Sequence, residues 1–143
     1  MNARIQLPVE EYTTPCPIAV ELETSYENVI ELMEENNIRH VPVVVDEKAV
    51  GIISRRDLVH LEKFNLDTDL RAKDLMQPEP YCVVSSESLG RVAFELSKRK
   101  IGSAVVVDDE EKMVGIFTST DALNALIEIV RGDFEEGFAP SAE

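Results

Sequence analysis

The chain has 143 residues, enough to bury one good-sized core or two small ones. Its 14 basic and 28 acidic residues give a net charge of −14, which repels phosphate backbones, so we expect no nucleic-acid partner. A salt-loving source and an ordinary acidic cytosolic protein both fit this charge. The sequence has no apolar run of about 18 residues and no secretory leader, which predicts a cytoplasmic protein with no membrane partner.

The first predicted elements are a short strand and an amphipathic helix. A proline-flanked segment, Pro15-Cys16-Pro17, precedes the predicted strand over residues 18–20. The apolar residues that follow recur at helical spacing: Tyr26, Val29, Ile30 and Met33. This period predicts a helix that buries one face. Cys16 and Cys82 are too few for a disulfide framework or a metal site, and we expect both to be small buried thiols.

A predicted β-hairpin and a second helix complete this half of the chain. The β-branched segments 41–45 and 50–54 are short, apolar and joined by a charged turn, which is typical of paired buried strands. A helix is predicted over 56–63. The polar residues after it predict a connector over 64–73.

The second half repeats this order at a fixed offset. Tyr26 matches Leu89 and Met33 matches Leu96, both 63 residues on, whereas Gly51 matches Gly115 at an offset of 64. The extra residue falls in the hairpin turn, where an insertion is tolerated. The predicted elements here are a strand over 81–84, a helix from residue 89, strands over 104–107 and 113–118, and a helix over 119–131.

The duplication predicts an α/β (α+β) fold built from two β-α-β-β-α repeats. Repeat 1 spans 7–63 and repeat 2 spans 74–131, followed by a flexible acidic tail over 132–143. A unit of about 60 residues is marginal alone, so we expect the repeats to pack together as a pseudo-twofold pair.

The chain resembles the cystathionine-β-synthase (CBS) domain family in two features of each repeat. A valine run follows the loop that ends the first helix, and the pattern Gly-Ile-x-Ser/Thr-x-x-Asp precedes the second helix. The resemblance covers roughly residues 7–131 and is made specific by the two copies of the motif. It implies a stand-alone CBS pair (Bateman module) that binds AMP, ADP, ATP or S-adenosylmethionine in clefts between the repeats, with AMP first. It also implies a homodimer and a separate regulated protein. A structural dimerisation module with empty clefts is the competing interpretation.

Each repeat places a hydroxyl and a carboxylate three residues apart where a strand meets a helix. Ser54 and Asp57, and likewise Thr118 and Asp121, fit a helix N-cap and its capping box. The same helix end offers N–H groups to an anion. The resemblance implies that each carboxylate accepts hydrogen bonds from ribose hydroxyls and each hydroxyl donates to phosphate.

The charges around the two motifs differ. Repeat 1 has Arg39, His40, Arg55 and Arg56, where repeat 2 has Gly102, Ser103, Ser119 and Thr120. We therefore expect the phosphates in the repeat 1 site, and a less charged ligand or none in the other. The alternative is that these arginines only solvate the start of a helix.

Pro42 cannot donate a hydrogen bond, which leaves backbone groups near His40 and Val41 for a base edge, although a proline at the first residue of a strand needs no such role. The complete set of expected ligand-binding residues is Thr14, Arg39, His40, Val41, Pro42, Ser54, Arg55, Arg56, Asp57, Ser103, Ala104, Thr118, Ser119, Thr120 and Asp121.

Catalysis is not expected. His40 and His60 are the only histidines, and neither has a nucleophile at a recognisable spacing. The sequence contains no Gly-rich phosphate loop and no metal-ligand pattern, so we predict neither a catalytic centre nor a metal site nor a resident cofactor.

Overall fold

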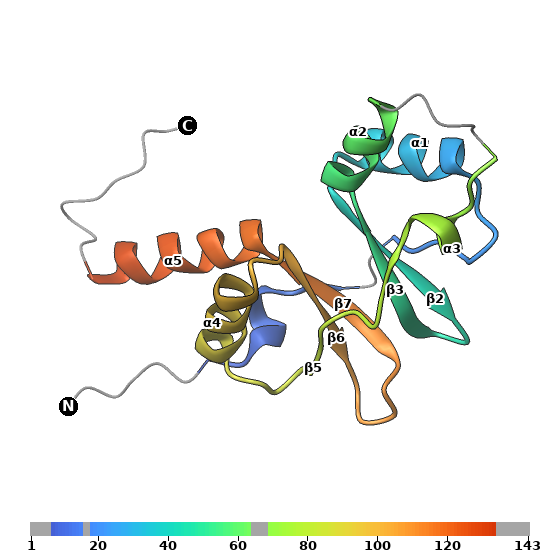
Figure 1. The fold of residues 1–143 in the computed structure, drawn as a ribbon. Helices are drawn as coiled ribbons and strands as arrows, with labels where there is room; N and C mark the ends of the chain where they lie inside the picture. Colours follow the sequence, from blue (N-terminus) through green and yellow to red (C-terminus); the bar gives the residue numbers. More distant parts are fainter. Residues whose placement is uncertain (1–6, 16–17, 64–68, 134–143) are drawn as a thin grey trace.

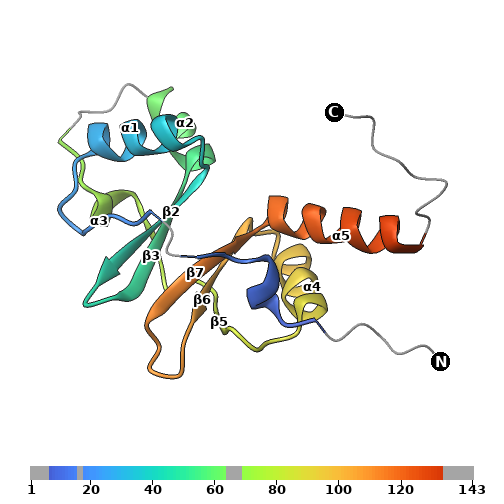
Figure 2. The same cartoon turned by 180° about the vertical axis from the view of Figure 1, so that it is seen from behind.

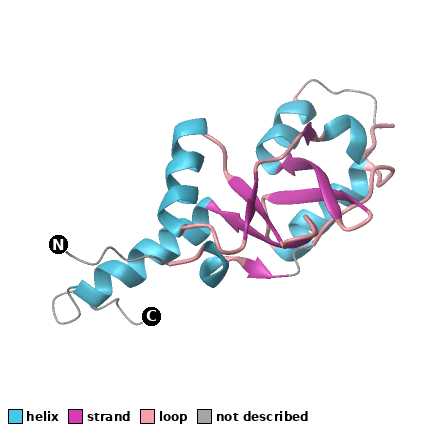
Figure 3. Cartoon of the chain, turned by 90° about the horizontal axis from the view of Figure 1, so that it is seen from below, coloured by secondary structure: helices cyan, strands magenta, loops and turns pink. Residues whose placement is uncertain are grey.

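The computed structural model describes residues 7–15, 18–63 and 69–133. Two halves lie side by side, each with a hairpin and two main helices, and the strands gather between the helices (Figures 1 and 3). The elements are η1 (Val9–Tyr12), β1 (Thr14–Pro15), α1 (Tyr26–Asn36), β2 (His40–Val45), β3 (Lys48–Ser54), α2 (Arg55–Glu62), α3 (Ala72–Leu75), β4 (Gln77–Pro78), β5 (Cys82–Val84), α4 (Leu89–Arg99), β6 (Ser103–Val107), β7 (Met113–Thr118) and α5 (Ser119–Asp133).

The first helix of each half is confirmed, and the two end in the same way. Ser25 caps α1 by accepting a hydrogen bond from the Asn28 N–H, and Ser88 caps α4 in the same way. Each helix stops at a residue in the left-handed conformation, Asn37 with φ 52° and Lys100 with φ 58°. Asparagine is a common choice at such a position, and lysine is an uncommon one.

Both predicted hairpins are confirmed as antiparallel pairs. His40 lies opposite Ser54 in β2 and β3, and Ser103 lies opposite Thr118 in β6 and β7. Each hairpin has a bulge at the same point, between Val43 and Val44 and between residues 106 and 107. The duplication therefore preserves irregularities as well as regular elements.

The predicted strand over 81–84 is β5, which pairs parallel to β6, but the strand predicted over 18–20 is reduced to one bridge between Val20 and Val43. In repeat 2 the Val105 N–H donates to the Tyr81 carbonyl at 2.8 Å. Pro42 stands at the position of Val105 and has no N–H, so the ladder cannot extend back to Ile18.

Two further predictions are corrected. Pro42 is the third residue of β2, not the first, and it is fully buried. Cys82 is exposed because the short strand β5 alternates outward and inward and buries only Val83; Cys16 lies outside the described residues.

The two halves exchange the segments that precede them. β1 pairs with β7 of repeat 2, with Thr14 opposite Ile116, while β4 pairs with β3 of repeat 1, with Gln77 opposite Ile52. The sheets are thus ordered β1-β7-β6-β5 and β2-β3-β4. Each sheet contains a strand from the arm that leads into the other repeat.

The cores follow the same exchange. Val9 of η1 is fully buried with Leu96 and Phe117 in the core of repeat 2, and Figure 2 shows η1 beside α4 and β7. Ala72 and Leu75 of α3 lie in the core of repeat 1. Packing therefore crosses the boundaries expected from the sequence repeat, 7–63 and 74–131.

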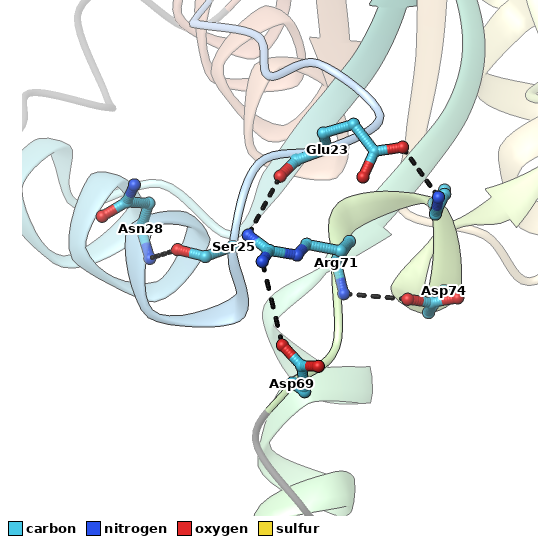
Figure 4. A network of polar contacts seen from close by, with 7 residues as sticks. Glu23, Ser25, Asn28, Asp69, Arg71 and Asp74 are labelled. Carbon is cyan, nitrogen blue, oxygen red and sulfur yellow. Dashed lines mark hydrogen bonds and ion pairs between the residues drawn. The ribbon is translucent and has the colours of Figure 1, made fainter.

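A polar network holds the α3 arm against repeat 1 (Figure 4). The Lys73 ammonium pairs with the Glu23 carboxylate at 2.7 Å, and an Arg71 guanidinium N–H donates to the Glu23 carbonyl at 3.4 Å. The Tyr26 N–H donates to the Leu70 carbonyl at 3.0 Å. The equivalent hydrogen bond in the other half is donated by the Leu89 N–H to the Leu7 carbonyl, at 2.7 Å.

One glycine in each hairpin is required by these arms. A Cβ at Gly51 would lie 2.3 Å from the Met76 Sδ, and one at Gly115 would lie 2.7 Å from the Thr14 carbonyl oxygen. Each glycine lies directly opposite an arm proline, Gly51 opposite Pro78 and Gly115 opposite Pro15. The shared glycine of the motif thus lets an arm approach the edge of its sheet closely.

The segments outside the repeats are partly helical. The predicted connector over 64–73 includes the first two residues of α3, and its residues 64–68 lie outside the described residues. α5 runs to Asp133, two residues into the predicted tail, and the rest of that tail is likewise not described. None of the described helices has the length and apolar character of a membrane span.

Candidate functional site

A cleft of about 1320 Å³ lies between the two halves. Repeat 1 supplies the loop after α1, the end of β3 and the start of α2, and β4 lies along one wall. Repeat 2 supplies the loop between α4 and β6. The residues that line the cleft are Met33, Glu34, Asn37, Ile38, Arg39, His40, Ile52, Ser54, Arg55, Arg56, Asp57, Gln77, Pro78, Glu79, Pro80, Tyr81, Arg99, Lys100, Ile101, Gly102, Ser103 and Val105.

Seven of the expected ligand-binding residues line this cleft: Arg39, His40, Ser54, Arg55, Arg56, Asp57 and Ser103. Val41, Pro42 and Ala104 are buried. Thr14 is exposed on β1, and residues 118–121 mark the end of β7 and the start of α5. The cleft therefore brings together six of the nine expected residues of repeat 1 with one residue of repeat 2.

The two capping motifs differ in their hydrogen bonds. The Asp121 carboxylate accepts from the Thr118 N–H at 2.8 Å and from the Thr118 hydroxyl at 3.1 Å. In both repeats the aspartate N–H donates to the hydroxyl three residues earlier, Asp57 to Ser54 at 3.2 Å and Asp121 to Thr118 at 3.3 Å. No hydrogen bond to the Asp57 carboxylate occurs among the described residues, so both of its oxygens are open to a ligand in the cleft.

Some of the cationic side chains in the cleft already have partners. The Arg55 guanidinium lies 3.7 Å from the Glu34 carboxylate. The Arg99 guanidinium lies 3.0 Å from the Glu95 carboxylate and 4.2 Å from the centroid of the Tyr81 ring. Arg39, Arg56 and Lys100 have no ion pair within the described part of the chain.

His40 lies where the two repeats touch. A Cβ at Gly102 would lie 2.6 Å from the His40 Nε2, so the imidazole packs directly on the backbone of the opposite repeat. Burial lowers the pKa of His40 below its ordinary value of 6.5, the Arg39 guanidinium lowers it further, and the Asp57 carboxylate opposes both. His40 is therefore neutral at pH 7 and can become cationic beside a bound anion.

Sequence reasoning missed the residues that repeat 2 and the β4 arm contribute to the cleft. Arg99, Lys100 and Tyr81 all line it. The fixed offset gave one signal, since Arg99 and Lys100 match Asn36 and Asn37 at the end of the repeat 1 helix. The Ser/Thr-x-x-Asp motif follows the second strand of each hairpin and does not include this loop.

Comparison with solved structures finds this architecture elsewhere. CBSX2 of Arabidopsis thaliana, solved in complex with AMP, is 30% identical over 87% of this chain and 98% of that one, with a TM-score of 0.77. The acetoin utilization protein AcuB from Vibrio cholerae is 28% identical over 92% and 99% of the two chains, with a TM-score of 0.84.

Curated relatives include larger proteins. MJ1232 of Methanocaldococcus jannaschii is 33% identical over 75% of this chain and 34% of its own length. The inosine-5'-monophosphate dehydrogenase of Korarchaeum cryptofilum is 32% identical over 73% of this chain but only 21% of that enzyme. The chain thus spans about a fifth to a third of these two relatives.

The CBS domain family matches the chain twice, over residues 9–63 and 72–128. The matches cover both repeats and begin at equivalent points, η1 and α3. The chain therefore belongs to the CBS domain family, as a pair of CBS repeats.

Proposed function

We propose that this CBS pair is a regulatory module that binds an adenosine-containing ligand in the cleft and signals its occupancy to another protein. Related structures contain AMP in CBSX2, 5'-methylthioadenosine with S-adenosylmethionine in MJ0100, and ATP in a bacterial CNNM/CorC transporter CBS domain. These ligands share an adenosine moiety. AMP, which the sequence puts first, is the starting candidate.

The observation that carries the proposal is the open Asp57 carboxylate beside unpaired cations in one cleft. A carboxylate next to a phosphate would repel it, so Asp57 suits the two hydroxyls of a ribose. Ser54 at the helix start and the exposed arginines suit the phosphate. The ribose of an adenine nucleotide supplies the two hydroxyls, and its phosphate ester supplies the anion.

The mechanism is a population shift. A ligand that contacts both repeats favours the arrangement in which they close on it, by no more than its differential affinity for the two states. The regulated protein, a cytoplasmic location and the lack of intrinsic catalysis are parts of the same proposal.

Calorimetric titration with AMP, with adenosine as a reference, tests the proposal on Asp57→Asn. We expect the isosteric change to weaken AMP binding at least about tenfold, because hydrogen bonds to a charged acceptor are strong. The melting temperature should stay unchanged, because Asp57 contributes only its N–H to the cap. Asp109→Asn, an exposed change in the hairpin turn of repeat 2, serves as the control. Equal AMP affinity in the three proteins would contradict the role of Asp57.

A dimerisation module is the second candidate, and a specific surface favours it. Four large apolar side chains are exposed on the two main helices of repeat 2: Phe94 (58%), Leu123 (60%), Leu126 (54%) and Ile127 (45%). Such a face is typical of an interface.

If this face joins two copies of the chain, Leu126→Glu should yield a monomer, which light scattering would detect. A module that only dimerises would show no melting shift with AMP, ATP or S-adenosylmethionine, whereas a ligand at about 100 times its Kd adds about 2.7 kcal/mol.

A further inference from the structure

The outer surface of the first main helix differs between the two halves. α1 and α4 (Figure 1) each have six exposed residues, and the offset of 63 places the two sets at equivalent positions. On α1 these residues are Glu27, Asn28, Glu31, Glu34, Glu35 and Asn36. On α4 they are Gly90, Arg91, Phe94, Ser97, Lys98 and Arg99. The exposed positions are thus acidic in repeat 1, whereas repeat 2 has basic residues and a phenylalanine there.

The contrast holds when every charge of the two helices is counted. α1 has four glutamates and no basic residue, a charge of −4, whereas α4 has three basic residues and Glu95, a charge of +2. The Glu95 carboxylate lies 3.7 Å from the Arg91 guanidinium and 3.0 Å from that of Arg99, so it offsets part of their charge. The Lys98 ammonium has no ion pair among the described residues and lies 5.9 Å from the centroid of the Phe94 ring. The face of α4 is therefore cationic in a chain of net charge −14.

Two carboxylates of α1 lack a cation of their own. Glu34 pairs with Arg55 at 3.7 Å, and both residues line the cleft. Glu31 and Glu35 have no ion pair in the part of the chain that the structure describes. Like charges four residues apart on a helix repel each other. A cationic surface placed against α1 would relieve this repulsion.

An apolar surface adjoins the cationic one. Large apolar side chains are 45–60% exposed on α4 and on α5, which packs beside it: Phe94, Leu123, Leu126 and Ile127. On α5 the Asp121 carboxylate is bound by Thr118, and Glu128 accepts a hydrogen bond from Tyr12 at 3.4 Å. Burying the apolar side chains favours association but does not choose an orientation. A second copy covers them whether each half meets the same half or the opposite half of its partner.

Charge decides between these two orientations. If each half met its own copy, α1 would face α1 and α4 would face α4, and both contacts would place like charges together. If each half met the opposite half, the −4 of α1 would face the +2 of α4, and a twofold axis would repeat this favourable contact. Like charges across an interface exclude wrong arrangements, and opposite charges fix the orientation.

We infer that this surface binds a second copy of the chain head to tail, with α4 and α5 of one copy packed against α1 and α2 of the other, twice about a twofold axis. Glu31 and Glu35 then face Arg91 and Lys98 of the second copy. The inference rests on the dimerisation proposed above as the second candidate, and it adds which halves meet.

Two charge-reversed chains, Glu31→Lys/Glu35→Lys and Arg91→Glu/Lys98→Glu, test it by sedimentation equilibrium at low salt. Each chain alone would place like charges together in the head-to-tail contact, so we expect its dimer to dissociate at least about tenfold more readily than the native dimer. In an equal mixture, opposite charges face each other again at both contacts. The mixture should therefore form a heterodimer with an affinity within about threefold of the native one. High salt should narrow all of these differences.

Asp109→Lys/Glu110→Lys is the matched control. It makes the same change in net charge as the α1 variant, at two exposed residues in the hairpin turn of repeat 2, and should leave the dimer affinity within about threefold of the native value. Circular dichroism melting of each variant shows that it is folded.

The inference is overturned if Glu31→Lys/Glu35→Lys tightens the dimer, which is the result expected when each half meets its own copy. It is also overturned if the two folded charge-reversed chains stay monomeric when mixed, or if the control weakens the dimer as much as they do. A native chain that is monomeric at every concentration overturns the inference together with the dimerisation candidate. Calorimetric titration with AMP decides the ligand-binding function separately, so the two failures are distinguishable.

Discussion

The helix that follows the hairpin begins differently in the two halves. In repeat 2 the Asp121 carboxylate is held by both polar groups of Thr118, and the next residues are Ser119 and Thr120. In repeat 1 the carboxylate of Asp57 faces the cleft unbonded among the described residues, and two arginines precede it. One local motif therefore caps a helix in both halves, but its carboxylate is part of the cap in one half and is open to the cleft in the other. Spacing alone does not decide its role.

The largest expected difference between the halves is at the two hairpin glycines. Gly115→Ala should lower the free energy of unfolding by about 3 kcal/mol, because the new Cβ meets the Thr14 carbonyl oxygen and backbone cannot easily move. Gly51→Ala should cost about half as much, because its Cβ meets the flexible side chain of Met76. Urea unfolding of both variants measures these two losses of stability. Equal losses would show that both arms can move aside equally well for the new Cβ.

The exchanged arm gives the next largest effect. Val9→Ala should lower the free energy of unfolding by about 2 kcal/mol, since Val9 is fully buried. Hydrogen exchange should speed up in α4 and β6 of repeat 2 rather than in α1, although Val9 belongs to repeat 1 in sequence. Val45→Ala, at a strand position with 39% exposure, is the control and should cost little. Faster exchange in α1 would refute the exchange of cores.

A smaller effect separates the two carboxylates. Asp121→Asn should lower the free energy of unfolding by about 1 kcal/mol, because it weakens both hydrogen bonds from Thr118. Asp57→Asn should change it by no more than a few tenths of a kcal/mol, because the cap in repeat 1 uses the Ser54 hydroxyl. Thermal unfolding without ligand measures both, and a larger loss in Asp57→Asn would mean that this carboxylate also serves the fold.

The smallest effect is the pH dependence of His40, which has a serine, Ser103, as its counterpart. Its pKa is lowered by burial and by Arg39, so the unfolded chain takes up a proton first as the pH falls below 6.5. The contribution of neutral His40 to stability is thus complete above pH 6.5 and is lost on acidification towards the lowered pKa. A bound phosphate raises this pKa, so nucleotide binding should take up a proton below neutral pH.

Replacing His40 with Asn should flatten the pH dependence of unfolding between pH 7 and pH 5.5 and abolish the proton uptake, which calorimetry in buffers of different ionisation enthalpy detects. Proton uptake that persists in the variant would assign it to another group.

Local pattern predicted much of this structure. The helical period of Tyr26 to Met33 and its repeat at Leu89 to Leu96 gave α1 and α4, and the valine runs gave both hairpins, because each of these patterns reports burial of one face. Pro42 shows the limit on the strand side. Its effect falls on Ile18, 24 positions earlier in the chain, where the missing N–H shortens a strand.

The cleft was predicted from one side only. Arg39, Arg55 and Asp57 stand near a recognisable motif, so spacing could find them. Lys100 reaches the same cleft only because the halves pack about a pseudo-twofold axis, and no local period encodes that packing. The strands in the two arms could not be predicted from local pattern either, because β1 and β4 have two residues each, too few to show alternation.

The reciprocal exchange of β1 and β4 has a consequence for the ancestry of such chains. A peptide that contained one repeat and its own leading arm would have no partner in itself for that arm, and it could complete its sheet only on a second copy. Joining two such peptides end to end keeps every one of these contacts and makes them intramolecular. In one joined chain the two copies need not have the same sequence, so one half can carry arginines where the other carries serine and threonine.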